Sequence, residues 1–408
     1  MRILYLTQWF DPEPGVIKGT AFVARLIESG HQVIVVTGLP NYPTGKIYPG
    51  YRFRAFQVEE RDGLIIHRLP LYPSHNSSSI GRAVNFLSFF FSALLYGLLR
   101  GGRFDLAYVY HPPITVGLAA ALFGYVHRLK FILEIQDLWP DTVVASGMSG
   151  TTKMHQMLTT CCNFVYKRAS MIIVQSNAMK TILVGRHVPC EKLAVIYNWA
   201  DSSALSSKQP YGRSLLADRK RFTFLYAGNL GRAQALESVI MAAHRASQSG
   251  AVLDLVLIGD GIDAGRLKSL ASSINADNVR FLPRVSIEEI RTYIEDTDVL
   301  MMHLSNESHF SATIPSKTQY YLAVGKPIIA GVSGEAADLL RRSGAAIVVP
   351  PQDVELLAKA MTMLSNESLD KLIEFGKNGK QFYTNNMSFE SGMSQTIRII
   401  DKVANFIK

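Results

Sequence analysis

Short apolar runs of strand length alternate with helical patterns along most of this 408-residue chain. This alternation constrains the fold most, because continuous apolar strands separated by helices are typical of parallel sheets covered on both faces. In the first half we expect helices near Thr20–Glu28 and Thr115–Val126, and strands at Ile3–Leu6, Val33–Thr37, Leu64–Arg68, Leu106–Tyr110, Phe131–Ile135, Ile172–Gln175 and Val195–Tyr197. The sequence therefore predicts an α/β fold with a doubly wound, Rossmann-like sheet.

The alternation stops at residues 198–221, a stretch rich in serine with Pro210 and Gly212, and then restarts. We predict a first domain at 1–198, a second at 199–387, and a C-terminal helix at 388–408 that packs back on the first. Ligands of open α/β sheets bind outside the carboxyl ends of the strands, so we expect the two Rossmann-like domains to face a central cleft that holds the ligands.

Composition places the chain among globular proteins, with 48% hydrophobic and 18% charged residues. Its three cysteines, Cys161, Cys162 and Cys190, lack the spacing of a zinc site or a disulfide framework, which favours reduced, cytoplasmic thiols. The first ten residues are too short an apolar stretch for a secretory signal and are expected to begin with a buried strand.

Positive charge is concentrated in residues 1–195, which carry 19 Lys and Arg against 11 Asp and Glu, whereas residues 196–408 carry 23 against 22. The same half contains the apolar stretch Val84–Leu99, flanked by Arg82, Arg100 and Arg103. At 16 residues it is shorter than the roughly 20 of a membrane span, so a core helix, an interfacial helix and a span all remain open.

Basic residues at both ends of that stretch favour contact with anionic lipid. We therefore expect a peripheral position on the inner face of the cytoplasmic membrane. Nucleic acid is not expected as a partner, because the basic residues are scattered and no recognition motif accompanies them.

The second half contains a helix near residues 314–327 that begins after an irregular loop. Pro315 suits the first helical position, and Gly325 and Pro327 end the helix. Lys317 then falls in the first turn, where the free N–H groups of a helix bind phosphate. Alone, this lysine is equally well interpreted as a solvated side chain.

Two glycine turns precede that helix, each directly after an expected strand. The turn 228–234 contains Gly228 and Arg232, and the turn 259–262 begins with Gly259 and Asp260. Each turn alone is a weak signal, but together with the Lys317 helix they predict a site for a nucleotide diphosphate at the carboxyl edge of the second sheet.

In the first half, Asp137 and Trp139 follow the strand Phe131–Ile135, and His111 ends another strand. Asp137 could act as a base or hydroxyl anchor and Trp139 could stack on a sugar, or the two could cap a helix and fill the core. His111 would reach the rim of the cleft, although such a histidine is more often structural. In the turn 11–19, glycines including Gly15 allow close approach of a ligand or make a tight turn.

Asp296 and Asp298 form an Asp-x-Asp pair, a pattern that holds a metal ion in some enzymes that bind nucleotide sugars. Here the pair ends an expected helix and precedes the strand Val299–His303, at the opposite edge of the sheet. No metal is therefore assigned to it.

Six stretches together resemble the family-4 glycosyltransferases with the GT-B fold, in particular the WbuB-like and WcaI-like enzymes of bacterial surface-polysaccharide synthesis. The stretches are residues 12–15, 28–33, 134–140, 197–201, 226–234 and 314–317 with 325–327. The resemblance covers nearly the whole chain.

The resemblance implies transfer of a sugar from a nucleotide diphosphate donor, with UDP expected, to an acceptor bound by the first domain. It implies retention at the anomeric carbon, no cofactor and no catalytic metal. The resemblance to the WbuB-like members implies a donor sugar of the N-acetyl-L-fucosamine type and a polyprenyl-diphosphate-linked glycan as the acceptor. This reaction would belong to O-antigen, capsule or exopolysaccharide synthesis.

The chain departs from the family at both glutamates that are expected eight residues apart, which correspond to Ala312 and Tyr320. The family's arginine and lysine of the glycine turn correspond to Asn229 and Gln234. Arg232 and Lys317 must then carry more of the diphosphate charge. The resemblance and the turns together imply Asp137, Lys317 and Arg232 as catalytic residues, Gly15, His111 and Trp139 on the acceptor side, and Gly228, Asn229, Gln234, Gly259, Asp260, Ser316 and Tyr320 as donor-binding residues.

Two other functions remain open at this stage. A nucleotide-sugar 2-epimerase shares the fold, but it needs no lipid acceptor and should lack the apolar helix. A binding scaffold that has lost turnover is suggested by Ala312 and Tyr320.

Overall fold

The computed structural model describes residues 1–74, 79–145, 152–200, 221–307 and 311–405. The chain forms two compact units. Unit 1 comprises Met1–Tyr197 and Gly392–Lys408, and unit 2 comprises Asn198–Ser391. Most of the expected connection at 198–221 lies outside the described residues.

Unit 1 is built on an eight-stranded sheet with the order β3-β4-β2-β1-β5-β6-β7-β8. All neighbouring strands are parallel except β3 and β4, which pair antiparallel. The strands are β1 (Arg2–Thr7), β2 (Gln32–Gly38), β3 (Gln57–Arg61), β4 (Leu64–Leu69), β5 (Leu106–His111), β6 (Lys130–Ile135), β7 (Met171–Val174) and β8 (Leu193–Val195).

The edge strand β3 was not predicted, because its residues are mostly exposed and form no apolar run. An edge strand that is exposed to solvent needs no continuous run of apolar residues. It is held by the carboxylate of Glu59, which accepts a hydrogen bond of 2.6 Å from Nε of the fully buried Arg68 on β4.

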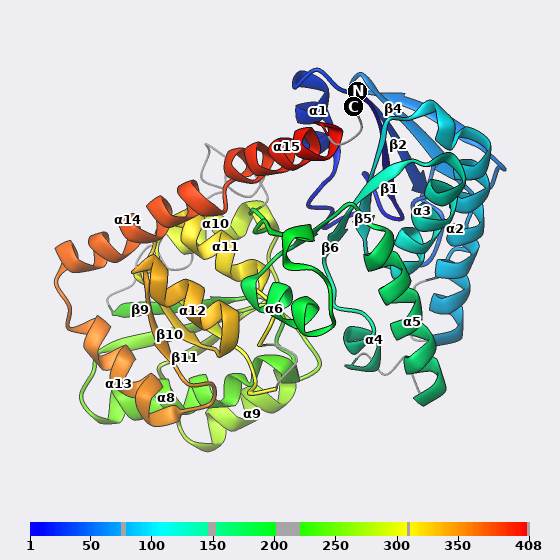
Figure 1. Ribbon diagram of the computed structural model, residues 1–408. Coiled ribbons are helices and arrows are strands. Elements are labelled where there is room, and N and C mark those ends of the chain that lie inside the picture. Colours follow the sequence, from blue (N-terminus) through cyan, green and yellow to red (C-terminus); the bar gives the residue numbers. More distant parts are fainter. Residues whose placement is uncertain (75–78, 146–151, 201–220, 308–310, 406–408) are drawn as a thin grey trace. The chain divides into compact units, whose positions relative to one another are not determined.

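Helices cover both faces of the unit 1 sheet (Figure 1). α2, α3 and α5 lie side by side on one face, and α1 lies on the other. The helices of this unit are α1 (Thr20–Glu28), α2 (Ser79–Arg100), η1 (Gly101–Arg103), α3 (Ile114–His127), α4 (Asp141–Ala145), α5 (Thr152–Arg168), α6 (Asn177–Gly185), η2 (Cys190–Lys192) and most of α15 (Phe389–Asn405).

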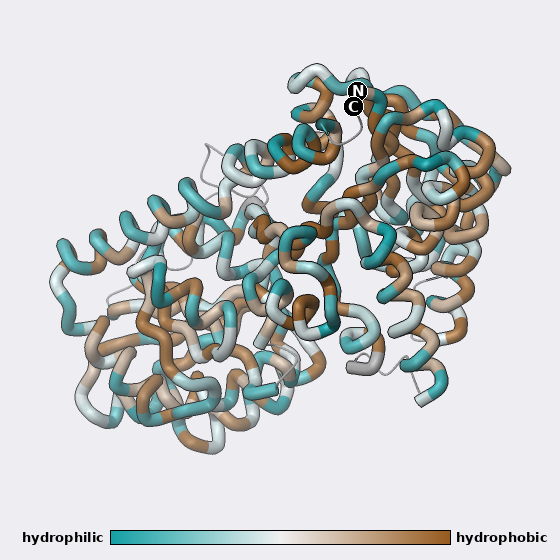
Figure 2. The backbone as a smooth tube through the Cα atoms, in the orientation of Figure 1, coloured by the Kyte–Doolittle hydropathy of each residue, from teal (hydrophilic) through white to brown (hydrophobic). Residues whose placement is uncertain are grey.

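The apolar stretch predicted at 84–99 lies within the longer helix α2. Its inner face includes Phe89, with no exposed surface, and Phe90, with 9%, whereas Phe91 is 63% exposed. The helix thus contributes to the core on one face and leaves apolar residues uncovered on the other. By length and composition alone, Ser79–Arg103 could also cross a membrane, with a third of its most apolar window buried. Hydrophobic residues recur along α2 and along the strands (Figure 2).

Unit 2 is built on a six-stranded, fully parallel sheet with the order β11-β10-β9-β12-β13-β14. Its strands are β9 (Phe222–Ala227), β10 (Leu253–Ile258), β11 (Val279–Leu282), β12 (Val299–His303), β13 (Ile328–Gly331) and β14 (Ala346–Val349). Its helices are η3 (Arg232–Gln234), α8 (Leu236–Gln248), α9 (Ala264–Ser273), α10 (Ile287–Glu295), α11 (Ser316–Val324), α12 (Gly334–Ser343), α13 (Val354–Ser365) and α14 (Leu369–Asn386).

The helix predicted around Lys317 is α11. Pro315 has an extended backbone and lies directly before the first helical residue, Ser316. The prediction that Pro315 is the first helical residue was wrong. Lys317 still falls in the first turn, and Gly325 ends the helix at φ 77°, a left-handed conformation that glycine adopts without strain.

Candidate functional site

Two glycine turns meet at the carboxyl edge of the unit 2 sheet. Gly228 follows β9 at φ 147° and Gly259 follows β10 at φ 149°. A Cβ atom on Gly259 would lie 1.9 Å from the carbonyl oxygen of Gly228, so no side chain fits there. The N–H of Leu230 also donates to the carbonyl of Asp260 at 2.9 Å. The two turns therefore form one packed backbone surface, which we call the unit 2 edge.

Lys317 lies over the first of these turns. Its Nζ is 3.7 Å from the centre of the Tyr226 ring, and a Cβ atom on Gly228 would lie only 2.6 Å from Nζ. Glycine at 228 thus makes room for the ammonium group. The structure thus brings Lys317 and the first glycine turn together, and their joint role in binding a donor stays a prediction.

Burial lowers the pKa of Lys317 to about 7. No carboxylate forms an ion pair with it among the residues that the structure describes. A buried ammonium costs free energy unless an anion accompanies it. The position is therefore suited to an anionic ligand.

Side-chain amides hold the first turn in shape. Oε1 of Gln234 accepts hydrogen bonds from the N–H of Gly231 at 3.2 Å and from Nδ2 of Asn229 at 3.3 Å. The Tyr226 hydroxyl donates to the carbonyl of Asn229 at 2.8 Å. The side chains of Asn229 and Gln234 thus hold the turn in its shape. The Gly231 N–H is bonded to Gln234 and is not free to bind a ligand.

His303, the last residue of β12, contacts the same turn through a hydrogen bond to the backbone of Gln234. This contact was not predicted. Nε2 of His303 accepts from the N–H of Gln352 at 3.0 Å, so the ring proton lies on Nδ1, 2.8 Å from the carbonyl of Gln234. Burial lowers the pKa of His303, which favours this neutral form. The sequence did not indicate this contact, because a single histidine at the end of an apolar strand has no pattern that predicts its partners.

Arg232 is exposed at the start of η3. Its charge lies near Asp263, whose pKa is held down chiefly by Arg266 and to a smaller extent by Arg232. In the described part of the chain no contact joins Arg232 to Lys317. Its role toward a diphosphate therefore remains a prediction.

Three other predicted donor residues lie around this edge. Ser316 is exposed at the first position of α11, and Asp260 is exposed with Oδ1 accepting from the Gly261 N–H at 2.7 Å. Tyr320 lies one turn into α11, where its hydroxyl is buried and finds no hydrogen-bond partner among the described residues. Burial raises its pKa, with smaller effects from Arg291 and Glu295 on α10, so the ring lies toward that helix.

The carboxyl edge of the unit 1 sheet, the unit 1 edge, is organised by side chains instead. Asp137 follows β6 and is partly buried, and this burial raises its pKa. No described side chain donates a hydrogen bond to its carboxylate. Asp137 does not cap a helix through its side chain, so it is available to accept a hydrogen bond from a ligand.

His111 and Trp139 are buried, and the expectation that His111 reaches a rim was wrong. His111 has no exposed surface, and burial lowers its pKa to about 3, so the ring is neutral. Trp139 is 8% exposed and packs edge-on against His111, with ring centres 6.0 Å apart, and against Phe86 of α2. These contacts use the Trp139 ring for packing, which leaves little of it to stack on a sugar.

The glycine turn after β1 is filled by the protein itself. The Asp11 carboxylate accepts hydrogen bonds of 2.6 and 2.7 Å from the N–H and hydroxyl of Thr20, at the start of α1. A Cβ atom on Gly19 would collide with that carboxylate at 2.4 Å. Gly19 therefore serves the turn. Gly15 is exposed, at φ 77°, with open space around it.

A buried ion pair beneath the unit 1 edge was not predicted. Nζ of Lys18 lies 3.1 Å from Oε1 of Glu134, with side chains only 1% and 2% exposed. The Tyr108 hydroxyl donates to the same carboxylate, and Nε2 of Gln136 donates to it at 2.8 Å. This network fixes the loop after β1 to strand β6. Asp137 lies two residues after the end of β6.

A second buried network connects this edge to α2. The Glu13 carboxylate accepts from the backbone N–H groups of Asn41 and Tyr42, each at 2.8 Å. Asn85 of α2 accepts from Nε2 of Gln8 at 2.6 Å. The apolar helix is thus tied by polar contacts to the loops after β1 and β2.

The pair Asp296 and Asp298 lies at the amino edge of the unit 2 sheet, as predicted. Asp296 ends α10, and Oδ2 of Asp298 accepts from the N–H of Thr223 at 2.8 Å. Within the described ranges, no group of three or more His, Cys, Asp or Glu side chains could hold a metal ion.

Two units with doubly wound, largely parallel sheets, the second with a half-buried lysine over paired glycine turns, indicate the GT-B class of glycosyltransferase fold. Comparison with known proteins agrees. Residues 20–199 match the Glycosyl transferase 4-like domain, and residues 207–382 match Glycosyl transferases group 1. The chain belongs to the group 1 glycosyltransferases that carry a GT4-like N-terminal domain.

Similar proteins include WcaI of Escherichia coli strain K12, a glycosyl transferase provisionally assigned to colanic acid biosynthesis. It is 26% identical over 88% of this chain and 90% of its own length. The provisionally assigned glycosyltransferase WbjE of Pseudomonas aeruginosa is 24% identical over 74% of this chain and 76% of its own.

Solved structures share the fold at low identity. Anabaena HepE in complex with UDP has a TM-score of 0.68 at 14% identity, covering 98% of this chain and all of its own. Trehalose 6-phosphate synthase of Burkholderia multivorans has a TM-score of 0.69 at 12% identity, covering 99% and 97%. These likenesses establish the architecture.

Proposed function

We propose that the chain transfers a sugar from a nucleotide diphosphate donor, bound at the unit 2 edge, to a lipid-linked glycan acceptor, bound at the unit 1 edge. The observation that carries the proposal is the Lys317 ammonium, half-buried over Gly228 and without a carboxylate partner in the described chain. Such a group stabilises an anion that binds there, and it stabilises it more as negative charge grows on a departing diphosphate.

The bond between the anomeric carbon and the diphosphate oxygen breaks, the acceptor hydroxyl oxygen forms the new bond with retention, and the hydroxyl proton passes to the departing diphosphate. Lys317, Arg232 and the N–H groups at the start of α11 stabilise the leaving diphosphate. Asp137 accepts a hydrogen bond from the acceptor hydroxyl and orients it. No metal takes part in this proposal.

UDP is the proposed nucleotide. Support comes from the related fold of HepE, whose solved structures hold UDP and UDP-glucose. The glutamate that grips the ribose in the family is replaced by Tyr320, so the ribose contact must differ in this chain.

The proposed acceptor is a polyprenyl-diphosphate-linked glycan, used in surface-polysaccharide synthesis at the inner face of the cytoplasmic membrane. The uncovered apolar side chains of α2 support a lipid-linked acceptor, because this helix is joined to the unit 1 edge through Asn85. The colanic acid assignment of WcaI supports the same process.

The test is incubation of the full chain with a panel of UDP-sugars, including UDP-N-acetyl-L-fucosamine, and polyprenyl-diphosphate-linked acceptors, followed by mass spectrometry. We expect the acceptor to gain the mass of one sugar. A new sugar nucleotide without any acceptor would identify an epimerase, and UDP binding without either product would identify a scaffold. Both results would contradict the proposal.

A further inference from the structure

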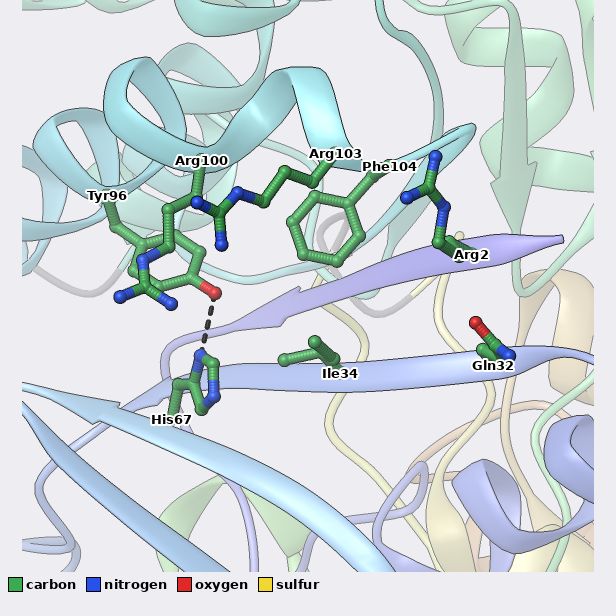
Figure 3. Close-up of a pocket in the computed structure, with 8 residues that line it drawn as sticks. All are labelled: Arg2, Gln32, Ile34, His67, Tyr96, Arg100, Arg103 and Phe104. Carbon is green, nitrogen blue, oxygen red and sulfur yellow. Dashed lines mark hydrogen bonds between the residues drawn. The ribbon is translucent and has the colours of Figure 1, made fainter.

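Two buried histidines of unit 1, His67 and His111, differ in their hydrogen bonds. His67 lines a cavity of about 210 Å³, where its Nδ1 lies 2.7 Å from the Tyr96 hydroxyl (Figure 3). His111, at the carboxyl edge of the same sheet, has no exposed surface, and neither of its ring nitrogens has a partner among the described residues. Because burial keeps the His111 ring neutral, it offers one donor and one acceptor.

Gln8 adds an acceptor beside His111. Strands β1 and β5 pair in register at Thr7 and Tyr110, so Gln8 and His111 occupy the next positions on neighbouring strand ends. Gln8 has no exposed surface, and its Oε1 has no partner among the described residues. Its Nε2 donates to Oδ1 of Asn85 on α2 at 2.6 Å. Buried polar atoms are nearly always partnered, so these two side chains are suited to a polar ligand.

A row of four aromatic rings, which we call the ring row, lies beside these side chains. Consecutive ring centres are 5.9, 6.1 and 6.0 Å apart in the order Tyr42, Trp9, Phe86 and Trp139. Trp9 directly follows Gln8 and Phe86 directly follows Asn85, so the contact between these two rings adjoins the Gln8–Asn85 hydrogen bond. The first three rings are half-buried, which leaves part of their surface open.

Polar contacts hold the ring row in place. The N–H of Tyr42 donates to the Glu13 carboxylate at 2.8 Å, and the Thr7 hydroxyl donates to the carbonyl of Trp9 at 3.0 Å. Nδ2 of Asn85, next to Phe86, donates to the carbonyl of Tyr72 at 2.6 Å. A sugar ring presents C–H groups on its face and hydroxyls on its rim, so it suits flat rings that lie beside hydrogen-bonding groups.

We propose that the acceptor's sugar stacks on Trp9, between Tyr42 and Phe86, and that one sugar hydroxyl donates a hydrogen bond to Oε1 of Gln8. The hydroxyl reaches this atom when the contact between Trp9 and Phe86 opens. An apolar chain would also suit the rings, but it would leave the polar atoms of Gln8 and His111 without partners. The inference rests on the proposed function and deepens it, because it names the acceptor group and the residues that bind it.

The test is calorimetric binding of the full chain, in detergent, to the polyprenyl-diphosphate-linked glycans named above and to polyprenyl diphosphate without a sugar. Trp9→Leu keeps apolar bulk but loses the flat ring. It should bind the sugar-bearing lipid about tenfold more weakly and the sugar-free lipid unchanged. Trp9→Phe keeps a flat ring and should retain most of the affinity. The control is Tyr125→Leu, which removes a 69% exposed ring on α3 and should change neither affinity.

Gln8→Met tests the hydrogen bond. It should lower the ratio of the affinities for sugar-bearing and sugar-free lipid by about fivefold. A merely structural role of Gln8 would alter both affinities alike and leave the ratio unchanged. Thermal melting and UDP binding check that each variant folds.

Equal losses for the two lipids in Trp9→Leu would show that the ring row holds the lipid part, which would overturn the inference. No loss, or a wild-type chain that binds both lipids equally, would overturn it as well. Sugar-specific binding that Trp9→Leu loses, without transfer by the wild type, would support the ring row and contradict the proposed transfer. Transfer with the same KM for the acceptor in wild type and Trp9→Leu would support the proposed function and overturn the ring row.

Discussion

The carboxyl edges of the two sheets are built in different ways. The unit 2 edge is mainly backbone: two glycine turns packed on one another, with the half-buried Lys317 as its charge. The unit 1 edge is mainly side chain: the Lys18–Glu134 pair, the Glu13 network and the buried rings of His111 and Trp139. Backbone N–H groups and one lysine suit an invariant diphosphate, whereas a surface made by side chains can be changed to suit another acceptor.

The two edges should also differ in what a mutation does. At the unit 2 edge, removal of a charge should reduce turnover and spare the fold, because Lys317 has no carboxylate partner in the described chain. Beneath the unit 1 edge, removal of either charge of the Lys18–Glu134 pair should first reduce stability, because the two side chains are buried against each other. The predictions below test this difference, from the largest expected effect to the smallest.

Lys18→Met should lower the free energy of unfolding by about 3–5 kcal/mol, because it leaves the Glu134 carboxylate buried without its cation. Urea denaturation measures this. The double variant Lys18→Met/Glu134→Gln removes both charges and should recover a large part of the loss. A double variant as unstable as the single one would show that packing, and not the unpaired charge, causes the loss.

Lys317→Ala should lower kcat by about 100-fold or more, as for the loss of one donor that stabilises transition-state charge. Steady-state sugar transfer with the acceptor identified above measures the effect. Lys359→Ala, an exposed lysine on α13, is the matched control and should behave like the wild type. Near-normal turnover of Lys317→Ala with its melting temperature unchanged would remove Lys317 from the mechanism.

Asp137→Asn should lower kcat/KM by about 30-fold, the equivalent of about 2 kcal/mol for a hydrogen bond to a charged group. The amide keeps the shape of the side chain but loses the charged acceptor. Asp141→Asn, four residues later and paired with Arg186, is the control. If both variants transfer sugar at the same rate, Asp137 does not contact the acceptor.

Tyr320→Glu should tighten UDP binding by about 1 kcal/mol, or about fivefold, by restoring a carboxylate for the ribose hydroxyls. Isothermal titration calorimetry measures this. Tyr320→Phe should leave binding unchanged, because the hydroxyl has no partner among the described residues. Weaker binding by Tyr320→Glu would mean that the tyrosine ring itself forms part of the nucleotide pocket.

The strands with apolar runs and the separate turns of the unit 2 edge could be predicted from the sequence, because each depends on neighbours in the chain. Gly228 follows its strand directly, and Lys317 falls in the first turn of a helix with clear end signals. The edge strand β3 could not be predicted, because its exposed residues leave no hydrophobic pattern.

The unit 1 networks could not be predicted for a different reason. Lys18 and Glu134 lie 116 positions apart in the numbering and meet only because β1, β5 and β6 are neighbours in the sheet. The burial of His111 also depends on packing, here against Trp139, and its position at a strand end wrongly suggested an exposed ring.

The most direct test of the Lys317 site is the pH dependence of UDP binding, measured by calorimetry between about pH 7 and pH 9, above the second phosphate pKa of about 6. The pKa of Lys317 without ligand is lowered to about 7, and a bound diphosphate should raise it. Binding then takes up a proton, so affinity should fall by up to about tenfold for each pH unit above 7. Lys317→Arg should bind UDP without this dependence, because arginine stays charged. Wild-type affinity that is constant over this range, or an equal decline in Lys317→Arg, would contradict the account.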